Sequence, residues 1–205
     1  MKLETRDPSQ LSIKQTQMQR DADAIVDMIG LERLLSDIGK PTRVGSSALG
    51  LMVRRDIDIT VSCKKLDEDT QRAVVDLAGR LAMHASVGSV HFRNDTGFWN
   101  NAVDEYPDGL YLNLTYRDRT GEDWTFDIWF VDEPERQPDL KHLHTIPPKL
   151  TSSAREAILT IKSALADGSS AGEHPSSFQV YSAVLDDGVT DLAGFKEWLA
   201  DTGRR

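Results

Sequence analysis

Apolar residues recur at intervals of three and four along two segments in the first half of the chain. Residues 21–38 have this spacing and are followed by Gly39 and Pro41, a pattern typical of an amphipathic helix with a stop signal. Residues 66–84 repeat the spacing, and Asp67 or Asp69 is available near the start as an N-cap. The pattern therefore predicts two amphipathic helices.

Other segments alternate polar and apolar positions, which is typical of a strand with one buried and one solvent-exposed face. Residues 56–62 read Asp-Ile-Asp-Ile-Thr-Val-Ser and are rich in β-branched side chains. Three further strands are predicted at 89–92, 110–116 and 124–131, after a short extended piece at 42–44. The last two strands are joined by a loop with Gly121 at a position that favours positive φ.

The pattern changes after residue 132, where prolines separate segments with helical spacing. Helices are predicted at 152–166, 176–185 and 191–199, each with a polar residue near its start. A mixture of helices and strands followed by a run of helices is typical of the α+β class. We therefore predict a domain over residues 1–132, a short mixed β-sheet backed by helices, with a helical C-terminal region over 133–205 packed on it.

Composition narrows the class of protein. The chain has 205 residues, of which 39% are hydrophobic, enough for a core of ordinary size. Its net charge is −9, and this excess falls on residues 101–205, because basic and acidic residues balance over the first hundred. An acidic second half repels phosphate backbones, so binding of long nucleic acid is not expected. The composition does not indicate an oligomeric state.

Cysteine content and hydropathy indicate the compartment. Cys63 has no second cysteine to pair with and is expected to be a small packed residue at the end of a strand. No apolar run reaches the ~20 residues that span a bilayer, and the first ten residues lack the apolar segment of a signal peptide. The expected location is the cytoplasm, without membrane association.

Two carboxylates on one strand provide the first chemical signal. Asp56 and Asp58 are separated by one residue, so their side chains project from the same face, about 6–7 Å apart. Carboxylates in this arrangement suit Mg²⁺, which prefers a few carboxylates together with substrate phosphates. Ten residues earlier, Gly45 and Ser46 form a turn whose backbone N–H groups and hydroxyl suit triphosphate oxygens.

A third acid, Asp127, lies within an otherwise apolar strand. A buried charge without a metal or partner is costly, which favours a functional role for this residue. Trp129 projects from the same strand face, where it either stacks on a base or acceptor or simply forms the wall of a pocket. In the loop 94–108, Phe98 and Trp99 are interpreted as a hydrophobic plug, with a lid as the alternative.

Basic residues near these acids have two interpretations. Arg54 and Arg55 directly precede the acidic strand, where they either contact phosphate or balance the local charge. Lys149, Arg155 and Lys162 lie at the start of one predicted helix and along it. We interpret these three as a solvated face, with phosphate contacts as the alternative.

The combination of these motifs resembles a known family. The segment Val44-Gly45-Ser46, Gly50, the Asp56-x-Asp58 strand and the later Asp127 are similar to the polymerase-beta-like nucleotidyltransferase superfamily over about residues 20–132. The resemblance implies that Asp56 and Asp58 hold metal ions and that Asp127 is a third metal ligand or the general base. It also implies two Mg²⁺ ions, and a nucleoside triphosphate, expected to be ATP, held by Gly45, Ser46 and Arg55.

The resemblance implies a function but not the acceptor. The leading hypothesis is a Mg²⁺-dependent nucleotidyltransferase that moves a nucleoside monophosphate to an acceptor hydroxyl. The small size of the chain and its acidic second half favour a compact cationic small molecule, such as an aminoglycoside- or lincosamide-like acceptor, over long RNA. One alternative is a noncatalytic descendant of the fold that binds a nucleotide or a protein, and another is a toxin-like enzyme acting on protein or tRNA.

Overall fold

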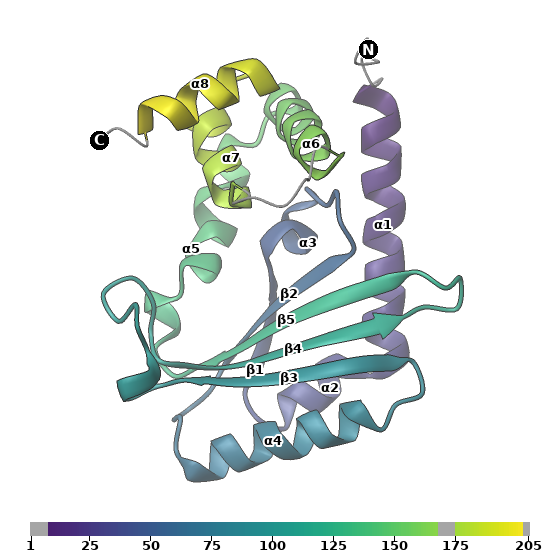
Figure 1. The fold of residues 1–205 in the computed structure, drawn as a ribbon, viewed down its shortest axis with the longest axis vertical. Helices are drawn as coiled ribbons and strands as arrows, with labels where there is room; N and C mark the ends of the chain where they lie inside the picture. Colours follow the sequence, from purple (N-terminus) through teal and green to yellow (C-terminus); the bar gives the residue numbers. More distant parts are fainter. Residues whose placement is uncertain (1–7, 168–174, 203–205) are drawn as a thin grey trace.

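The computed structural model describes residues 8–167 and 175–202, which form an α+β fold (Figure 1). The helices are α1 (Pro8–Ile29), α2 (Leu31–Ser36), α3 (Gly45–Leu49), α4 (Glu68–Ala82), α5 (Pro138–Thr145), α6 (Ser152–Asp167), α7 (Ser177–Leu185) and α8 (Leu192–Thr202). Short 3-10 turns lie at Gly97–Trp99, Pro134–Arg136 and Pro147–Lys149. None of the helices in these ranges combines the length and the hydropathy needed to cross a membrane.

Five strands form one mixed sheet, as the sequence resemblance implied. They are β1 (Lys40–Val44), β2 (Asp56–Ser62), β3 (Val87–Asp95), β4 (Gly109–Arg117) and β5 (Asp123–Val131), in the spatial order β1-β2-β5-β4-β3. Strands β2 and β5 are parallel, and the other neighbouring pairs are antiparallel. The parallel pair brings together two segments that are about seventy residues apart in the sequence.

The two faces of the sheet differ sharply in polarity. Alternate residues of β2, β4 and β5 enter the main core, where they pack with α4 and with residues of α1 and α2. This side of the sheet is apolar: Ile57, Ile59, Val61, Leu110, Leu112, Leu114, Tyr116, Phe126, Ile128 and Phe130. The opposite face carries the acidic and aromatic side chains that the alternation predicted.

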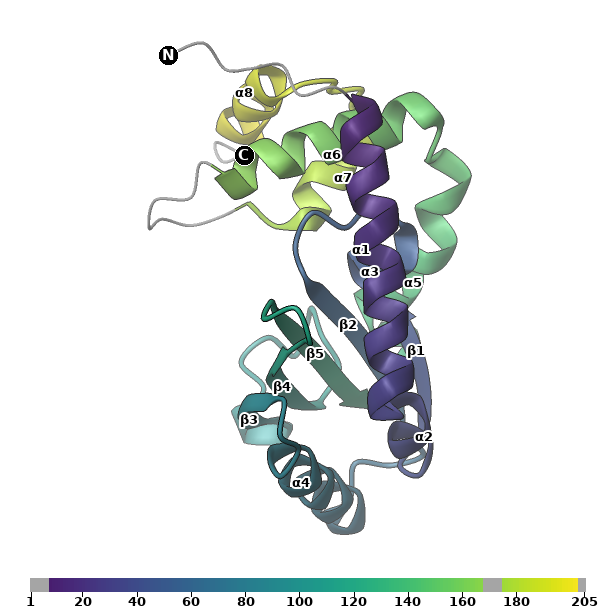
Figure 2. The same cartoon turned by 90° about the vertical axis from the view of Figure 1, so that its right-hand side faces the viewer.

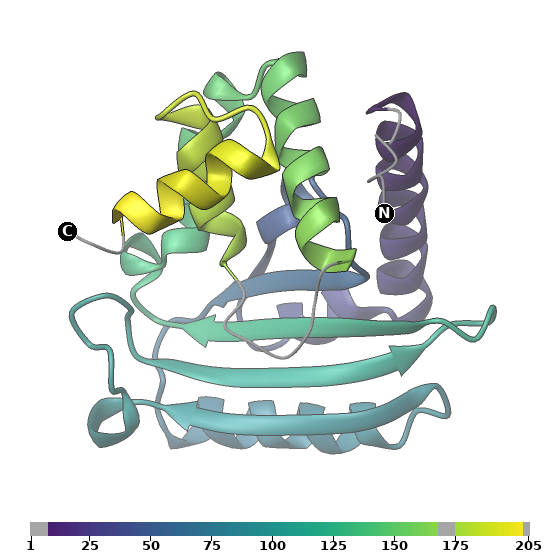
Figure 3. The ribbon, with the colours of Figure 1, turned by 45° about the horizontal axis from the view of Figure 1, so that its top comes forward.

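A second core lies within the C-terminal helices. It contains residues of α6, α7 and α8, together with Leu49 and Leu51 at the end of α3. Figure 2 and Figure 3 show these helices at one end of the molecule and α4 at the other, with the sheet between them. Helix α1 runs from the sheet to α6, which it contacts, so it connects the two ends. The division at residue 132 stays a prediction.

The first helical prediction is wrong in its bounds. Instead of one helix over 21–38, α1 begins at Pro8 and ends at Ile29, and α2 follows after Gly30. Gly30 has a φ of 64°, a left-handed conformation that breaks the helix and that glycine adopts without a steric penalty. The early turns of α1 carry mostly polar side chains, and Leu11 and Gln15 are the buried exceptions, so the apolar spacing there is too weak to detect.

The remaining elements follow the predictions more closely. Asp67 is the N-cap of α4 and accepts a hydrogen bond from the Thr70 backbone N–H. Cys63 is buried at the end of β2, as expected. Strand β3 is longer than the predicted 89–92, because its pairing with β4 continues to Asp95 at the sheet edge. The three C-terminal helices agree with α6, α7 and α8 to within a few residues.

Candidate metal centre and nucleotide pocket

Three carboxylates meet on the polar face of the sheet. Asp56 and Asp58 project from β2, and the parallel register places Asp127 of β5 directly beside Asp58. One carboxylate oxygen from each of the three lies within 4.8 Å of the other two. The arrangement arises because β2 and β5 are neighbouring strands, a pairing that the sequence pattern alone does not specify.

Burial and neighbouring negative charge make Asp56 and Asp58 resist ionisation. The pKa of Asp58 is raised to about 8, first by burial and then by the neighbouring charges of Asp56 and Asp127. The pKa of Asp56 is also raised by burial, although a hydrogen bond from the Thr125 hydroxyl at 2.7 Å acts in the opposite direction. The folded chain thus concentrates negative charge that only a cation or a proton relieves.

The donor set fits a hard divalent cation. Each of the three acids offers a carboxylate oxygen, and Mg²⁺ prefers oxygen ligands. In the described part of the chain Asp58 accepts no hydrogen bond, so its oxygens are available to a metal ion. A bound cation would offset the repulsion that raises the pKa of Asp58.

Two side chains of the adjacent strand β4 hold Asp127 in place. The Tyr111 hydroxyl donates to Oδ1 of Asp127, and the Asn113 amide donates to the same oxygen at 2.8 Å. Burial and the hydrogen bond to Asp127 raise the pKa of Tyr111, so this phenol stays a donor. Both donors reach Oδ1, and within the described residues no hydrogen bond is made to the other carboxylate oxygen of Asp127.

We expect Tyr111→Phe to lower turnover without weakening binding of the triphosphate. The substitution removes one hydrogen bond to a charged group, worth about 1.5–3 kcal/mol, and keeps the ring in place. A fall of about tenfold or more in kcat, with the KM for the triphosphate unchanged, is the expected kinetic result. An unchanged kcat would show that Asn113 alone suffices to position Asp127.

Gly45 lies against one of the carboxylates. It has a φ of 61°, and a Cβ added there would lie 2.7 Å from Cγ of Asp58 and would overlap Oδ2 of the same side chain. A side chain is therefore excluded both by the backbone conformation and by the carboxylate. This contact places the glycine-serine turn directly against Asp58, one of the three candidate metal ligands. One ligand bound to the turn can therefore also contact the acids.

A pocket opens next to this turn, between the sheet and the C-terminal helices. Ser46 and Asp56 line one side of it, and Lys162 of α6 and Ser177 of α7 line the other. Arg54 also lines the pocket, together with Val53, Leu165, Pro175 and Val180. The pocket therefore joins a hydroxyl, an acid and two cationic side chains, groups that can contact a metal ion and phosphate oxygens.

Lys162 contradicts the interpretation of its helix as a solvated face. Only 8% of the residue is exposed, and its ammonium donates to the Leu51 carbonyl at 2.9 Å and to the Tyr181 hydroxyl at 3.1 Å. Burial lowers the pKa of Lys162 to about 8, against the opposing effect of Asp58 and Asp56. This lysine is the buried cation that faces the acids.

The other basic candidates lie elsewhere. Arg55 forms an ion pair with Glu122 at 3.2 Å, whereas its neighbour Arg54 lines the pocket. Arg155 donates to the backbone carbonyls of Leu49 and Gly50, so it braces the end of α3. Lys149 pairs with Asp186 on the surface, which agrees with its interpretation as solvated.

Three features of this site were not predicted from the sequence: Tyr111, Asn113 and the burial of Lys162. Tyr111 and Asn113 alternate with Leu110, Leu112 and Leu114 along the strand, so their face was predictable. Their hydrogen bonds to Asp127 depend on the β4–β5 register, which the hairpin loop sets. Nothing in the local sequence marks Lys162, because the α6–α7 packing buries it.

Comparison with known proteins supports the fold. No family model matches the chain, and no curated protein matches it significantly. A structure of Cid1 in complex with the UTP analogue UMPNPP has a TM-score of 0.56 at 17% identity, covering 82% of this chain and 48% of that one. A second Cid1 structure, of an RNA terminal uridylyl transferase, has a TM-score of 0.51 at 17% identity over 82% and 46%.

A bacterial enzyme is similar as well. The STING-associated CdnE c-di-GMP synthase from Capnocytophaga granulosa has a TM-score of 0.52 at 14% identity, covering 89% of this chain and 65% of that one. The chain thus spans about half of the Cid1 structures and about two thirds of CdnE. It has the fold of these nucleotidyltransferases, which confirms the fold implied by the sequence resemblance.

Proposed function

We propose that the protein is a metal-dependent nucleotidyltransferase that moves a nucleoside monophosphate from a triphosphate to an acceptor hydroxyl. The observation that carries the proposal is the cluster of Asp56, Asp58 and Asp127, whose oxygens lie within 4.8 Å of one another beside a pocket lined by Ser46 and Lys162. Similar folds act on nucleotides: Cid1 is known in complex with a UTP analogue, and CdnE is a c-di-GMP synthase.

Each part of the site has a role in this proposal. Asp56 and Asp58 would hold Mg²⁺ ions, and Asp127 would complete the ligand set or accept the proton of the acceptor hydroxyl. Gly45 lets the triphosphate approach the acids, and Ser46 binds its oxygens. Lys162 and Arg54 line the same pocket, where they contact the phosphates. Arg55 is paired with Glu122 and does not line this pocket, so we assign the phosphate contact to Arg54 instead.

The transfer is an in-line displacement at the α-phosphorus. The acceptor oxygen forms a bond to this phosphorus, and the bond to the pyrophosphate oxygen breaks, so pyrophosphate leaves with the electron pair. Where Asp127 acts as the general base, the acceptor proton passes to its Oδ2, because Tyr111 and Asn113 both donate to Oδ1. When bound, Mg²⁺ supplies positive charge for the entering and leaving oxygens. Ser46 and Lys162 align the triphosphate, and the hydrogen bonds from Tyr111 and Asn113 hold Asp127 in place.

The acceptor and the choice of triphosphate are separate questions. ATP and a cationic small-molecule acceptor follow from the sequence resemblance and from the acidic second half of the chain. Cid1 has RNA terminal uridylyl transferase activity, so acceptors that carry a ribose hydroxyl should be tested together with small cationic acceptors. A noncatalytic descendant is the alternative, and retention of all three acids argues against it.

Transfer of label from each of the four α-³²P nucleoside triphosphates tests the proposal. The protein is incubated with Mg²⁺ and a panel of acceptors: an aminoglycoside, nucleotides, a short RNA and a protein extract. We expect labelled product and free pyrophosphate from the native protein, and neither from Asp58→Ala. Equal, background-level label in the two proteins across the whole panel would favour the noncatalytic alternative.

Lys162→Met is expected to weaken binding of the triphosphate. The substitution keeps most of the apolar stem but removes the cation that faces Asp56 and Asp58. We predict an increase of about tenfold or more in the KM for the triphosphate, because a charge-assisted hydrogen bond contributes roughly 1.5–3 kcal/mol. Lys149→Met, at an exposed lysine just before the same helix, is the control and should leave KM unchanged.

A further inference from the structure

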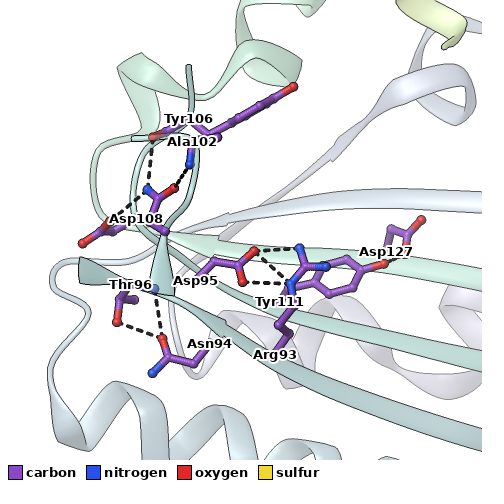
Figure 4. Close-up of polar contacts among 10 residues, drawn as sticks. Arg93, Asn94, Asp95, Thr96, Ala102, Tyr106, Asp108, Tyr111 and Asp127 are labelled. Atoms are coloured by element: carbon purple, nitrogen blue, oxygen red, sulfur yellow. Dashed lines mark hydrogen bonds and ion pairs between the residues drawn. The ribbon is translucent and has the colours of Figure 1, made fainter. Parts of the chain in front are cut away.

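The polar face of the sheet carries a stack of three side chains beside Asp127. Arg93 of β3, Tyr111 of β4 and Trp129 of β5 occupy one register row across the three strands. The guanidinium carbon of Arg93 lies 4.8 Å from the centre of the Tyr111 ring and 5.5 Å from that of Trp129. Figure 4 shows Arg93 between Asp95 and Tyr111, with the Tyr111 hydroxyl directed at Asp127.

The stack is fixed from several sides. Asp95 accepts three hydrogen bonds from Arg93, at 2.8 and 2.9 Å from Nε and at 2.6 Å from Nη2, which hold the guanidinium in one plane. The rings of Tyr111 and Trp129 lie 4.8 Å apart. A Cβ at Gly109 would lie 2.9 Å from the Trp129 ring, so this indole rests directly on the strand backbone.

The outer side of this stack is accessible. Half of the Arg93 side chain is exposed, although Asp95 pairs with its charge and holds it in place. A surface ion pair contributes little to stability, so fold stability alone does not account for this arrangement. Arg117 and Asp123, at the other end of the sheet, form an ion pair of similar geometry and have no ring contact in the described residues.

We propose that the guanidinium plane of Arg93 is the stacking platform for the nucleobase of the acceptor. This inference rests on the proposed function: the acceptor is a nucleoside, and its ribose hydroxyl attacks the α-phosphorus beside Asp127. Bases commonly stack on arginine planes and aromatic rings, and such stacking is tolerant of base identity. The platform therefore selects a flat ring rather than one particular base.

Charge and distance favour this acceptor over a cationic sugar. The Arg93–Asp95 pair is neutral overall and presents a guanidinium, which does not attract an ammonium group. Arg93 lies two strands from Asp127, about 10 Å at an interstrand spacing of about 4.8 Å. Tyr111 spans this interval by contacting Arg93 with its ring and Asp127 with its hydroxyl, so the platform and the reacting site are rigidly connected.

Binding of nucleosides tests the platform without requiring turnover. Adenosine and uridine are titrated, because they lack the phosphates that the pocket at Ser46 would bind. The indole N–H signal of Trp129 in a nuclear magnetic resonance spectrum is the readout, assigned through Trp129→Phe. We expect this signal to shift on titration, whereas the signal of the buried Trp124 stays in place.

Two arginine variants give the matched comparison. Arg93→Met keeps an apolar stem on the rings and removes the plane, so we expect nucleoside affinity to fall about tenfold or more. Arg117→Met removes an ion pair of similar geometry at a site where the described residues make no ring contact with the arginine, and it should leave the affinity unchanged. In the transfer assay, Arg93→Met should raise the KM of a nucleoside acceptor and leave that of the triphosphate unaltered.

A hexauridylate with a free 3′ hydroxyl distinguishes the two sources of such a base. Binding much tighter than that of uridine indicates the end of a strand, and equal binding indicates a free nucleotide; both support the platform. Absence of nucleoside binding, or equal affinity in Arg93→Met and the native protein, would overturn it. Nucleoside binding without any label transfer would retain the platform and instead remove the proposed transferase function.

Discussion

Asp58→Asn is expected to abolish nucleotidyl transfer and at the same time to stabilise the metal-free protein. Asp58 is the central acid of the cluster, beside Asp127 in the register and two residues from Asp56 on the same strand face. A bound metal ion offsets the charge that develops in the transition state, and it is held less well when one of its ligands is lost. Transition-state stabilisation then falls by several kcal/mol, which lowers the rate about a thousandfold. The stabilisation follows from the repulsion that the substitution relieves.

The pH dependence of stability gives the sign of this effect. In the metal-free protein the pKa of Asp58 is raised to about 8 by burial and by Asp56 and Asp127, whereas in the unfolded chain it takes its ordinary value near 4. The folded state therefore holds a proton that the unfolded state releases first. The contribution of Asp58 to stability is complete below about pH 4 and declines as pH rises to about 8, so the metal-free native protein should weaken across this window.

Thermal unfolding in a chelating buffer measures the effect. At pH 8 we expect the Tm of Asp58→Asn to exceed that of the native protein by about 3 °C or more, given roughly 2–4 °C per kcal/mol for a chain of this size. At pH 5 the difference should be much smaller. Added Mg²⁺ should raise the Tm of the native protein only. A lower Tm for Asp58→Asn at pH 8 would identify the acid as structural.

Gly45→Ala is expected to remove metal and triphosphate binding together. The added Cβ would overlap Oδ2 of Asp58, so the carboxylate or the turn must move. Gly30→Ala is the matched control, because Gly30 has nearly the same φ of 64° and no atom within 4 Å of an added Cβ. Both variants incur the left-handed strain of roughly 1–2 kcal/mol, and only Gly45→Ala disturbs the acids.

Calorimetric titration with Mg²⁺ and the α,β-imido analogue of ATP separates the two glycine variants. We expect the affinity of Gly45→Ala for the analogue to fall about a hundredfold or more, because displacement of the Asp58 carboxylate costs several kcal/mol of binding free energy. Gly30→Ala should bind the analogue normally and lose only thermal stability. Similar affinity in the two variants would separate the glycine-serine turn from the metal cluster and remove its assigned role as the phosphate cradle.

The sequence predicted the parts of the site that depend on local periodicity. Alternation along residues 56–62 and 124–131 placed Asp56, Asp58 and Asp127 on polar strand faces, and the structure puts all three on one face. The distance between Asp58 and Asp127 was not predictable, because it depends on β2 and β5 becoming parallel neighbours. That pairing is decided by the packing of the whole sheet.

Other features depend on contacts between distant segments and were therefore missed. Lys162 has ordinary helical spacing, and only the packing of α6 against α7 and the acids makes it a buried cation. The plug interpretation of Phe98 and Trp99 is wrong, because these residues are 91% and 64% exposed. The break at Gly30 was also missed, because apolar spacing continues across it and glycine alone does not specify a positive φ.

The central claim is that Asp56, Asp58 and Asp127 hold metal ions together, and counting bound ions tests it without knowledge of the acceptor. Electron paramagnetic resonance measures Mn²⁺ bound in the presence of the α,β-imido analogue of ATP. We expect two ions in the native protein and in Asp123→Asn, whose acid pairs with Arg117 on the surface, and fewer in Asp58→Asn and Asp127→Asn. The same number of ions in all four proteins would contradict this claim.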